Sequence, residues 1–482
     1  MTLTTLLALS VTAYVALIFV LAMVARARVE TVEDYVVAGR RLPLYLAAPT
    51  LLATWFGAET LLAATDEVHR SGLTGATLDP LGVGLCLLIA GAVFARPLWR
   101  EKLITMSDIF LRRYGRRAEW LSALLMVPPY FGWVAAQFMA VAGMLELFFG
   151  IPPAVGLVLI CVVGVTYTLI GGMWAVTLTD ALQVALLVVG LLMLGWVAMG
   201  QLGDGSVVAG LTRLRDDIPP ERWSLVGGDD ARALGTWLGV LAAGALGNLA
   251  SQDVMQRIFS ARSEQVAQQA CYVAGGTYLV LGVVPVLLGL GAFLVVPEGT
   301  ETEVLPLLAS VVLHPAGTVL FVVALLSMVM SSIDSGILAP ATVLARNVAE
   351  PLLGGRADML RLNRWAVFVV GAASLAVAAM GENAYSLLES SYQLGMVSLL
   401  VPLAIGVLAR RHSSAGATAS MIAGTALWVV HQALGVERFL GVGPGVLDIS
   451  IACTLVSLAA YVAASRIAGD ERQRTGQARG EG

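Results

Sequence analysis

The stretch Leu326-Ser-Met-Val-Met-Ser-Ser-Ile-Asp-Ser-Gly336 is polar at its centre and enclosed by apolar sequence on both sides. The surrounding run, residues 316–345, is long enough to cross a bilayer and contains one ionisable side chain, Asp334. A carboxylate at membrane depth is costly and typically marks an ion or proton path. The stretch therefore predicts an ion site inside a transmembrane helix, and with it a helical membrane protein.

One face of this expected helix gathers the polar groups. At about 100° per residue, Ser331, Asp334 and Ser335 share that face, and Ser332 flanks it. Three hydroxyls and a carboxylate supply the hard oxygen ligands that a small dehydrated cation needs. A serine in a membrane helix can also bond back to a carbonyl one turn earlier, but that alternative does not account for Asp334.

The composition places the rest of the chain in the membrane as well. Of the 482 residues 58% are hydrophobic and 13% are charged, which excludes an ordinary soluble globule and predicts an all-α polytopic membrane protein. About thirteen runs are long and apolar enough to span. They are residues 3–24, 44–64, 78–98, 120–149, 153–171, 175–199, 234–254, 270–295, 316–345, 365–380, 385–408, 415–430 and 443–464.

Orientation depends on arginine, because Lys102 is the single lysine. Most of the 29 basic residues fall in alternate loops that share one side, the largest group lying between residues 96 and 117. By the positive-inside rule, the amino terminus is expected outside and the tail in the cytoplasm, in the plasma membrane. Since its arginines follow it, the first run is expected to be an uncleaved span rather than a signal peptide.

Several function classes lack support in the sequence. The four cysteines all fall inside apolar runs and the four histidines are scattered singly, so neither disulfides nor a metal cluster is expected. The chain shows no nucleotide loop, nucleophile elbow or basic nucleic-acid patch. We therefore expect neither an enzyme nor a nucleic-acid-binding protein, and no cofactor. The expected partners are a small solute, an ion and the lipid bilayer; no oligomeric state is predicted.

Two of the expected spans are interrupted. Span 44–64 contains Ala53-Thr-Trp-Phe-Gly-Ala-Glu-Thr60, where a glycine beside Glu59 predicts a helix break whose freed backbone groups face a cavity. Span 234–254 has small residues up to Asn248 and then the acid and amide groups of residues 251–257. Close packing of small residues is the alternative, but packing does not need a buried acid. Two breaks five spans apart are what inverted five-helix repeats produce.

Other spans add polar groups. Tyr130, Trp133 and Gln137 share one helix face, where they either line a cavity or pack. Residues 389–393 form another polar cluster, which a purely structural helix does not need. Asp79-Pro80 predicts a helix start, with Asp79 as N-cap.

The join of the fifth and sixth spans carries the pattern Tyr167-Thr…Gly171-Gly172…Ala175-Val176…Thr179-Asp180…Gln183. Its two glycines predict a tight turn, with Asp180 about two turns into the next helix. Together with Met330-Ser-Ser-x-Asp-Ser335 and Gln256-Arg257…Ser260-Ala261, this pattern resembles the sodium:solute symporter family, which includes sugar, proline, pantothenate, choline and sialic-acid carriers. The resemblance runs from the first span to about the eleventh.

The resemblance implies a single transporter domain with a LeuT-like core of ten helices in a 5+5 inverted repeat. The core would occupy residues 44–410. An accessory first helix and cytoplasmic loop (1–43) would precede it, and two accessory helices (411–466) and a short cytoplasmic tail (467–482) would follow it.

The resemblance also implies ion sites. In that family a sodium ion lies between two hydroxyls of the eighth core helix and backbone carbonyls at the break of the first. The matching positions are Ser331 and Ser332, with the carbonyls of Ala53, Phe56 and Met328. Some members hold a second sodium at positions matching Asp180, Asp334 and Ser335. Because those members have a hydroxyl where this chain has Asp334, a second sodium, a proton and a fixed charge are all open.

A substrate cavity is expected between the interrupted spans and their neighbours. Its expected lining is Trp55, Glu59, Tyr130, Trp133, Gln137, Asn248, Gln252, Asp253, Tyr392 and Gln393. The cavity spans carry acids but no lysine or arginine at mid-membrane, which favours an amino acid, a choline-like amine or a polyamine over a simple carboxylate. Residues 55–59 depart from the sugar-carrier pattern, which argues against a sugar.

These expectations combine into a sodium-coupled secondary active symporter that moves a small organic solute into the cell by alternating access. Proton coupling or uncoupled transport is the first alternative. A membrane sensor built on the same domain is the second, and the short tail after Ala464 argues against it.

Overall fold

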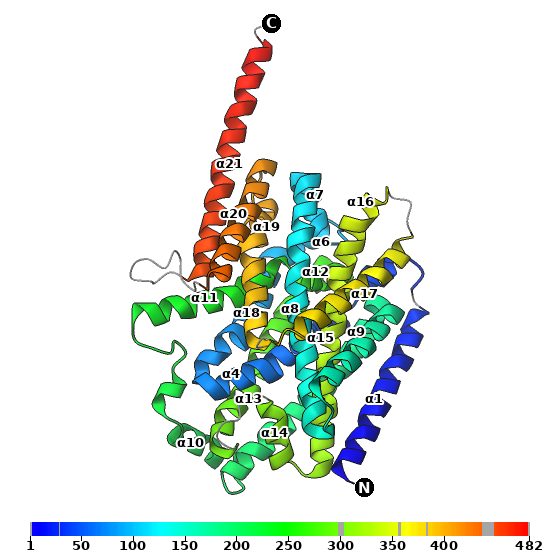
Figure 1. Cartoon of the computed structure of the whole chain (residues 1–482), viewed down its shortest axis with the longest axis vertical. Coiled ribbons are helices and arrows are strands. Elements are labelled where there is room, and N and C mark those ends of the chain that lie inside the picture. The colour runs from blue at the N-terminus through cyan, green and yellow to red at the C-terminus, as the bar shows by residue number, and fades with distance from the viewer. Residues whose placement is uncertain are drawn as a thin grey trace.

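The computed structural model describes residues 2–27, 29–296, 303–354, 358–381, 384–435 and 448–480, without the side chains of Gly171 and residues 469–480. The described residues form helices and no strand, apart from one isolated bridge between Leu42 and Ala261. Figure 1 shows the helices as one bundle with the two termini at opposite ends. The all-α polytopic class is thereby confirmed.

The elements follow one another along the whole chain. In order they are α1 (Leu3–Arg26), α2 (Val32–Val37), η1 (Ala38–Arg40), α3 (Leu44–Trp55), η2 (Glu59–Ala63), α4 (Ala64–Ser71), η3 (Gly72–Ala76), η4 (Thr77–Gly82), α5 (Val83–Ile89), η5 (Ala90–Phe94), α6 (Ala95–Arg100), α7 (Ser107–Tyr114), α8 (Arg116–Phe149), α9 (Pro153–Leu202), α10 (Val207–Asp217), η6 (Pro220–Trp223), α11 (Ala231–Gly247), η7 (Asn248–Ala250), α12 (Gln252–Ser260), α13 (Glu264–Val295), α14 (Val304–Val312), α15 (Pro315–Val343), η8 (Leu344–Ala349), α16 (Glu350–Leu352), α17 (Met359–Ala378), α18 (Ala384–Gly395), η9 (Met396–Leu400), α19 (Val401–Leu408), α20 (Ser414–Ala433) and α21 (Ile449–Gly480).

The described residues contain 11 helical stretches long and apolar enough to cross a membrane. The expected thirteen spans differ from these in two places. The helix α3 is too short to be counted, and the residues after its break form one stretch, Glu59–Arg100, with the third expected span; α20 is not among the 11. The expected second span was also too short, because its second half continues through α4 to Ser71.

The helix α15 lies at the centre of the bundle (Figure 1). It is buried along most of its length and packs against α3, α8, α9, α12 and α17. At the periphery, α1 packs on α9 and α15 and turns Leu9, Val20 and Met23 outward. Apolar side chains on an outer surface suit contact with lipid. The polar face of α15, by contrast, is buried and enclosed by protein.

The first expected break is present. The helix α3 ends at Trp55, Phe56 leaves the helical conformation with ψ 47°, and helical structure resumes at Ala58. A Cβ atom at Gly57 would lie 2.0 Å from the Ser332 Oγ atom. Only glycine therefore lets the broken helix approach α15 this closely.

The second expected break is also present, between α11 and α12. It consists of η7 and the extended residue Ser251 (φ −76°, ψ 146°). A Cβ atom at Gly247 would lie 2.3 Å from the carbonyl oxygen of Tyr392, so this break presses closely on α18. Because α12 packs against α3, the two interrupted helices meet inside the bundle.

Two local expectations have mixed outcomes. The tight turn between the fifth and sixth spans is confirmed, since Gly172 interrupts α9 with φ 55° and ψ −157°. Asp79 has extended backbone angles (φ −143°, ψ 130°), but the expectation that it caps a helix is wrong. Its carboxylate instead accepts hydrogen bonds from Thr60 Oγ1 (2.7 Å) and from the Tyr278 hydroxyl (2.9 Å).

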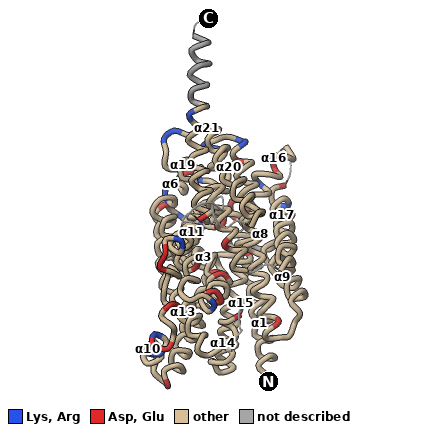
Figure 2. The backbone as a smooth tube through the Cα atoms, turned by 60° about the vertical axis from the view of Figure 1, so that its left-hand side comes forward, with Lys and Arg blue, Asp and Glu red and all other residues tan. Residues whose placement is uncertain are grey.

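Charged residues gather at both ends of the bundle. Figure 2 shows lysines and arginines near α6, α17 and α21, towards the end that carries the C-terminus, and a smaller mixed group at α10 near the opposite end. Arg28, Arg356 and Arg438, which entered the prediction of orientation, lie outside the described residues. The side chains of the tail arginines are likewise not described.

Candidate functional site

The ion face, defined as Ser331, Ser332, Asp334 and Ser335 on α15, lies against the end of α3. Ser331 Oγ lies 3.3 Å from the carbonyl oxygen of Ala53, and Ser332 Oγ donates to the carbonyl of Thr54 over 3.1 Å. These carbonyls are available because the helix breaks within the next turn. The structure thus brings Ser331, Ser332 and Ala53 together as expected.

Asp180 of α9 joins the same group of oxygen atoms. Its Oδ1 atom lies 2.5 Å from Ser331 Oγ, and its Oδ2 atom accepts a hydrogen bond from Thr50. Asp334 turns to another partner and accepts from Thr168 Oγ1 over 3.2 Å. Thr50, Asp180 and Asp334 are buried together with Ser331, so the site is an enclosed cluster of oxygen atoms.

Phe56 and Met328 lie next to this cluster. Phe56 is the first residue beyond α3, and its ring packs edge-on against Tyr278 with centroids 4.9 Å apart. Met328 lies one turn before Ser332 on α15 and is fully buried. That their carbonyls would bind sodium stays a prediction.

A buried arginine is the main residue that the sequence expectation missed. Arg257 of α12 is 1% exposed. It donates to the carbonyl oxygens of Thr50 (3.2 Å) and Asp253 (3.0 Å), and to the hydroxyl of Ser335. Arg257 is thus an enclosed basic residue on α12, the helix that carries Asp253, and the expectation of an acidic cavity did not take it into account. Expected span 234–254 ends three residues before Arg257.

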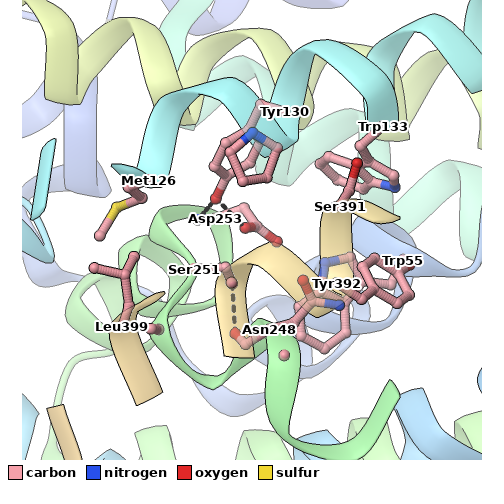
Figure 3. Close-up of a pocket in the computed structure, with 14 residues that line it drawn as sticks. Trp55, Met126, Tyr130, Trp133, Asn248, Ser251, Asp253, Ser391, Tyr392 and Leu399 are labelled. Atoms are coloured by element: carbon pink, nitrogen blue, oxygen red, sulfur yellow. Dashed lines mark hydrogen bonds between the residues drawn. The ribbon is translucent and has the colours of Figure 1, made fainter. Parts of the chain in front are cut away.

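A small cavity, the central cavity, lies between the two helix breaks. Figure 3 shows its wall, to which α3, α8, α12 and α18 contribute. The expected lining residues that the structure brings together here are Trp55, Tyr130, Trp133, Asn248, Asp253 and Tyr392. The other lining residues were not among those expected to line the cavity: Met126, Pro129, Gly247, Ala250, Ser251, Ser391, Gly395 and Leu399.

The central cavity combines aromatic rings with one carboxylate. Tyr130 and Trp133 meet edge to face, with centroids 5.8 Å apart. The Tyr130 hydroxyl donates to Asp253 Oδ1 (2.5 Å) and accepts from the Asp253 backbone N–H (3.1 Å), which fixes that carboxylate. Asp253 Oδ2 has no hydrogen-bond partner among the described residues, although Asp253 is only 1% exposed.

Other polar atoms of the wall are also unengaged. The Asn248 Nδ2 atom and the Tyr392 hydroxyl have no hydrogen-bond partner among the described residues. A buried polar group without a partner loses free energy unless a water molecule or a ligand satisfies it. The wall therefore holds unused donors and acceptors next to aromatic faces, as expected for a small polar ligand.

Two expected lining residues point elsewhere. Gln252 accepts from the Met106 backbone N–H (2.6 Å) and donates to the carbonyl of Ile104 (3.2 Å), so it anchors α12 to the loop before α7. Gln393 donates to Glu389 (2.9 Å) and accepts from the Trp428 indole (3.0 Å). Each is the helical neighbour of a lining residue, and a step of about 100° turns it away from the cavity.

Glu59 and Gln137 lie behind the wall of the central cavity. Gln137 donates to Glu59 Oε2 (2.6 Å) and accepts from the Ala58 backbone N–H (3.0 Å). Glu59 lines a second cavity. We call it the acidic cavity, because Asp66, Glu67 and Glu303 also line it and Arg70 is its one basic residue.

The chain is similar to known transporters over most of its length. The Sodium:solute symporter family matches residues 35–424. The human high affinity choline transporter 1 is 27% identical over 436 residues, which cover 86% of this chain and 73% of that protein. The sodium/pantothenate symporter of Escherichia coli (strain K12) is 24% identical over 480 residues, covering 97% of this chain and 98% of that protein.

Two solved structures support the fold. A Na+-coupled sialic acid symporter in a substrate-bound, outward-open state superposes with a TM-score of 0.79 at 19% identity, covering 96% of this chain and 97% of the other. A nucleobase-cation-symport-1 family transporter in a closed conformation superposes with a TM-score of 0.59 at 13% identity, covering 91% and 95%. The LeuT-like architecture expected from the sequence is thereby confirmed.

Proposed function

Because this chain belongs to the sodium:solute symporter family, we propose that it carries a small organic cation of the quaternary-ammonium class into the cell together with sodium. The family fixes the coarser part of this statement: the chain is a multi-pass membrane transporter rather than an enzyme, and sodium is the coupling ion. The class of solute, the residues of the site and the orientation are the proposal. We take the amino terminus as outside and the tail as cytoplasmic.

The observation that carries the solute class is the unpartnered Asp253 Oδ2 atom inside an aromatic wall. Tyrosine and tryptophan faces attract cations by about 0.5–2 kcal/mol each, more when water is excluded. The Asp253 carboxylate beside them offers an oxygen atom that a cation can approach. An ammonium group with methyl substituents would satisfy both without needing to donate hydrogen bonds.

A solute with a carboxylate is the competing possibility, because a pantothenate symporter is among the relatives. The N-terminus of α12 at the cavity would attract an anion. Asp253, however, lies in the first turn of that helix and already presents a negative charge there. The similarity to choline transporters agrees with the cationic alternative.

The same geometry supports coupling to sodium. The carbonyls of Ala53 and Thr54 face the ion face, whereas the next residue, Trp55, lines the central cavity. An ion bound between α3 and α15 would hold the Trp55 wall in place for the solute. At the expected second ion site, Asp180, Asp334 and Ser335, we favour a fixed charge over a second sodium. Arg257 already donates a hydrogen bond to the hydroxyl of Ser335.

Uptake of radiolabelled choline into proteoliposomes under an inward sodium gradient tests the solute class. Asp253→Asn keeps the shape of the side chain and its contact with Tyr130, so we expect a loss of roughly tenfold or more in apparent choline affinity. The matched control is Asp216→Asn, which removes an exposed acid on α10. Saturable sodium-driven uptake of pantothenate, with choline ignored, would overturn the proposal.

A further inference from the structure

The acidic cavity lies in line with the central cavity. Three segments line both cavities at successive turns. The end of α3 contributes Trp55 to the central cavity, and η2, after the break, contributes Glu59 to the acidic cavity. In α8, Trp133 lines the central cavity and Ala140 lines the acidic cavity. In α18, Tyr392 lines the central cavity and Leu388, one turn away, lines the acidic cavity. The two cavities are therefore consecutive chambers along the same helices.

Gln137 stands between the two chambers. Its amide holds both the Ala58 backbone N–H and one carboxylate oxygen of Glu59. The other oxygen, Glu59 Oε1, has no hydrogen bond of ordinary geometry to a described residue, although the Trp133 indole interacts with this carboxylate, and Glu59 is 1% exposed. A buried carboxylate oxygen without a partner is costly, and a cation in the acidic cavity would remove that cost.

The remaining acids of this cavity are largely engaged. Asp66 accepts the backbone N–H groups of Glu303 (3.1 Å) and Val304 (2.9 Å) and so caps α14. Glu67 pairs with Arg70 over 2.9 Å. Glu59 is consequently the acid with a buried oxygen still to be satisfied, in a cavity whose charged side chains are mostly negative.

The chemistry of the cavity favours an organic cation over a metal ion. Among the described residues no three histidine, cysteine, aspartate or glutamate side chains come close enough together to hold a metal. The walls between the acids are apolar, formed by residues such as Leu62, Met139 and Leu388. Carboxylates set among methyl and methylene groups suit an ammonium group that carries alkyl substituents.

We infer that the acidic cavity is a second binding site for the same organic cation, with Glu59 as its principal counter-charge. This inference rests on the proposed function. The site holds the cation one chamber away from the central cavity, at the end of the bundle opposite the C-terminus. With the amino terminus outside, it is the chamber that a solute would meet first on its way in.

The test is equilibrium binding of radiolabelled choline to the full chain in lipid nanodiscs with saturating sodium chloride. The wild type is expected to bind two choline molecules, one more tightly than the other. Glu59→Gln should weaken one of the two binding steps by roughly tenfold or more and leave the other in place. Asp253→Asn should weaken the other step instead. Glu221→Gln, which removes an exposed acid in η6, is the matched control and should bind as the wild type does.

A second variant guards against misfolding of the Glu59 substitution. Ala140→Trp adds bulk to the acidic cavity from α8 without touching the central cavity, and it should also remove one binding step. A stoichiometry of one that depends on Asp253 and is unchanged in both variants would overturn this inference while leaving the proposed function standing. Absence of choline binding in the wild type would overturn the proposed function and, with it, the inference.

Discussion

Gly57 shows how a single residue joins the ion face to the solute pathway. A Cβ atom there would lie 2.0 Å from Ser332 Oγ, 2.8 Å from Ser332 Cβ and 2.9 Å from Glu59 Oε2. The hydroxyl of Ser332 can reach the carbonyl of Thr54 only because this space is left open. The break after α3 therefore requires glycine at position 57 because of the space that a Cβ atom would occupy, and not only because of glycine's flexible backbone.

Gly57→Ala should therefore separate α3 from α15. We expect a loss of about 1–3 kcal/mol in stability, the range for overpacking a buried contact, together with a weaker response to sodium. Thermal unfolding of the purified protein with and without sodium measures both effects. The matched control is Gly276→Ala on α13, where a Cβ atom meets nothing within 4 Å. Equal stability and an equal sodium response in the two variants would contradict the steric argument.

For single residues, the sequence predicts which side chains are functional better than it predicts which way each side chain points. Ser331 and Ser332 were predicted because hydroxyls in an apolar run have few other uses. Arg257 was missed because counting charges assigns arginines to loops, and only the packing of α12 against α3 and α15 shows that this one is enclosed. Gln252 and Asp253 are neighbours, and the rotation of α12 alone decides which of them lines the cavity.

Among the helices, α7, α8 and η8 are joined by a polar network centred on Asp108. Its carboxylate accepts from the Asn347 side chain (3.2 Å), from Arg346 Nε (3.2 Å) and from the backbone N–H of Thr105 (3.1 Å). Burial by itself would raise the pKa of Asp108, but the Arg346 charge and the hydrogen bonds outweigh it and lower that pKa. The network thus stabilises the ionised carboxylate.

This network makes stability depend on pH in a definite direction. Because the folded protein holds the pKa of Asp108 below its unfolded value, the stabilisation is present above about pH 4 and is lost as the pH falls through the folded value. Asp108→Asn should destabilise the protein by about 1–2 kcal/mol at neutral pH, allowing for the partly exposed Arg346. The difference in melting temperature from the wild type should narrow below about pH 4. A constant difference across that range would show that the charge of Asp108 is not the cause.

The positions of breaks were predictable at the scale of elements, but their extent was not. Gly57 beside Glu59, and the small residues before Asn248, identified both interruptions. The unwound stretches and the continuation of α4 to Ser71 depend on contacts with α8, α13 and α18, which lie far away in the sequence. Local sequence patterns indicate where a helix is interrupted, and tertiary contacts decide how many residues the interruption includes.

For the whole molecule, the ion face connects parts of the chain that are otherwise separated by much of its length. Sodium bound at Ser331 and Ser332 would join α15 to the first half-helix, and Asp180 would add α9. Since an ion that binds the folded state stabilises it by mass action, binding should be visible in the global stability.

Thermal unfolding in sodium chloride against potassium chloride, at equal ionic strength, measures this link. Sodium at about 100 times its Kd should stabilise the wild type by about 2.7 kcal/mol, and Ser332→Ala should lose that sodium-specific gain. The variant should remain folded in potassium chloride, where no such gain exists. Equal melting temperatures of the wild type in the two salts would argue for a proton-coupled or uncoupled carrier.

The architecture as a whole was the most predictable level. Long apolar runs, one polar face and two breaks five spans apart define an inverted-repeat bundle, because few other folds satisfy every backbone group in lipid. The count of spans was less secure, since α3 is short and α20 is only moderately apolar. The acidic cavity could not be foreseen, because residues from four separate segments form it.

The adjacent residues Thr54 and Trp55 divide two tasks between two kinds of atom. Thr54 offers the ion face a main-chain oxygen, which every amino acid possesses, whereas Trp55 offers the cavity its own ring. Mutation can therefore remodel the solute chamber and leave the ion's ligands intact. Related proteins could therefore differ in the solute that they carry and still share the same sodium ligands.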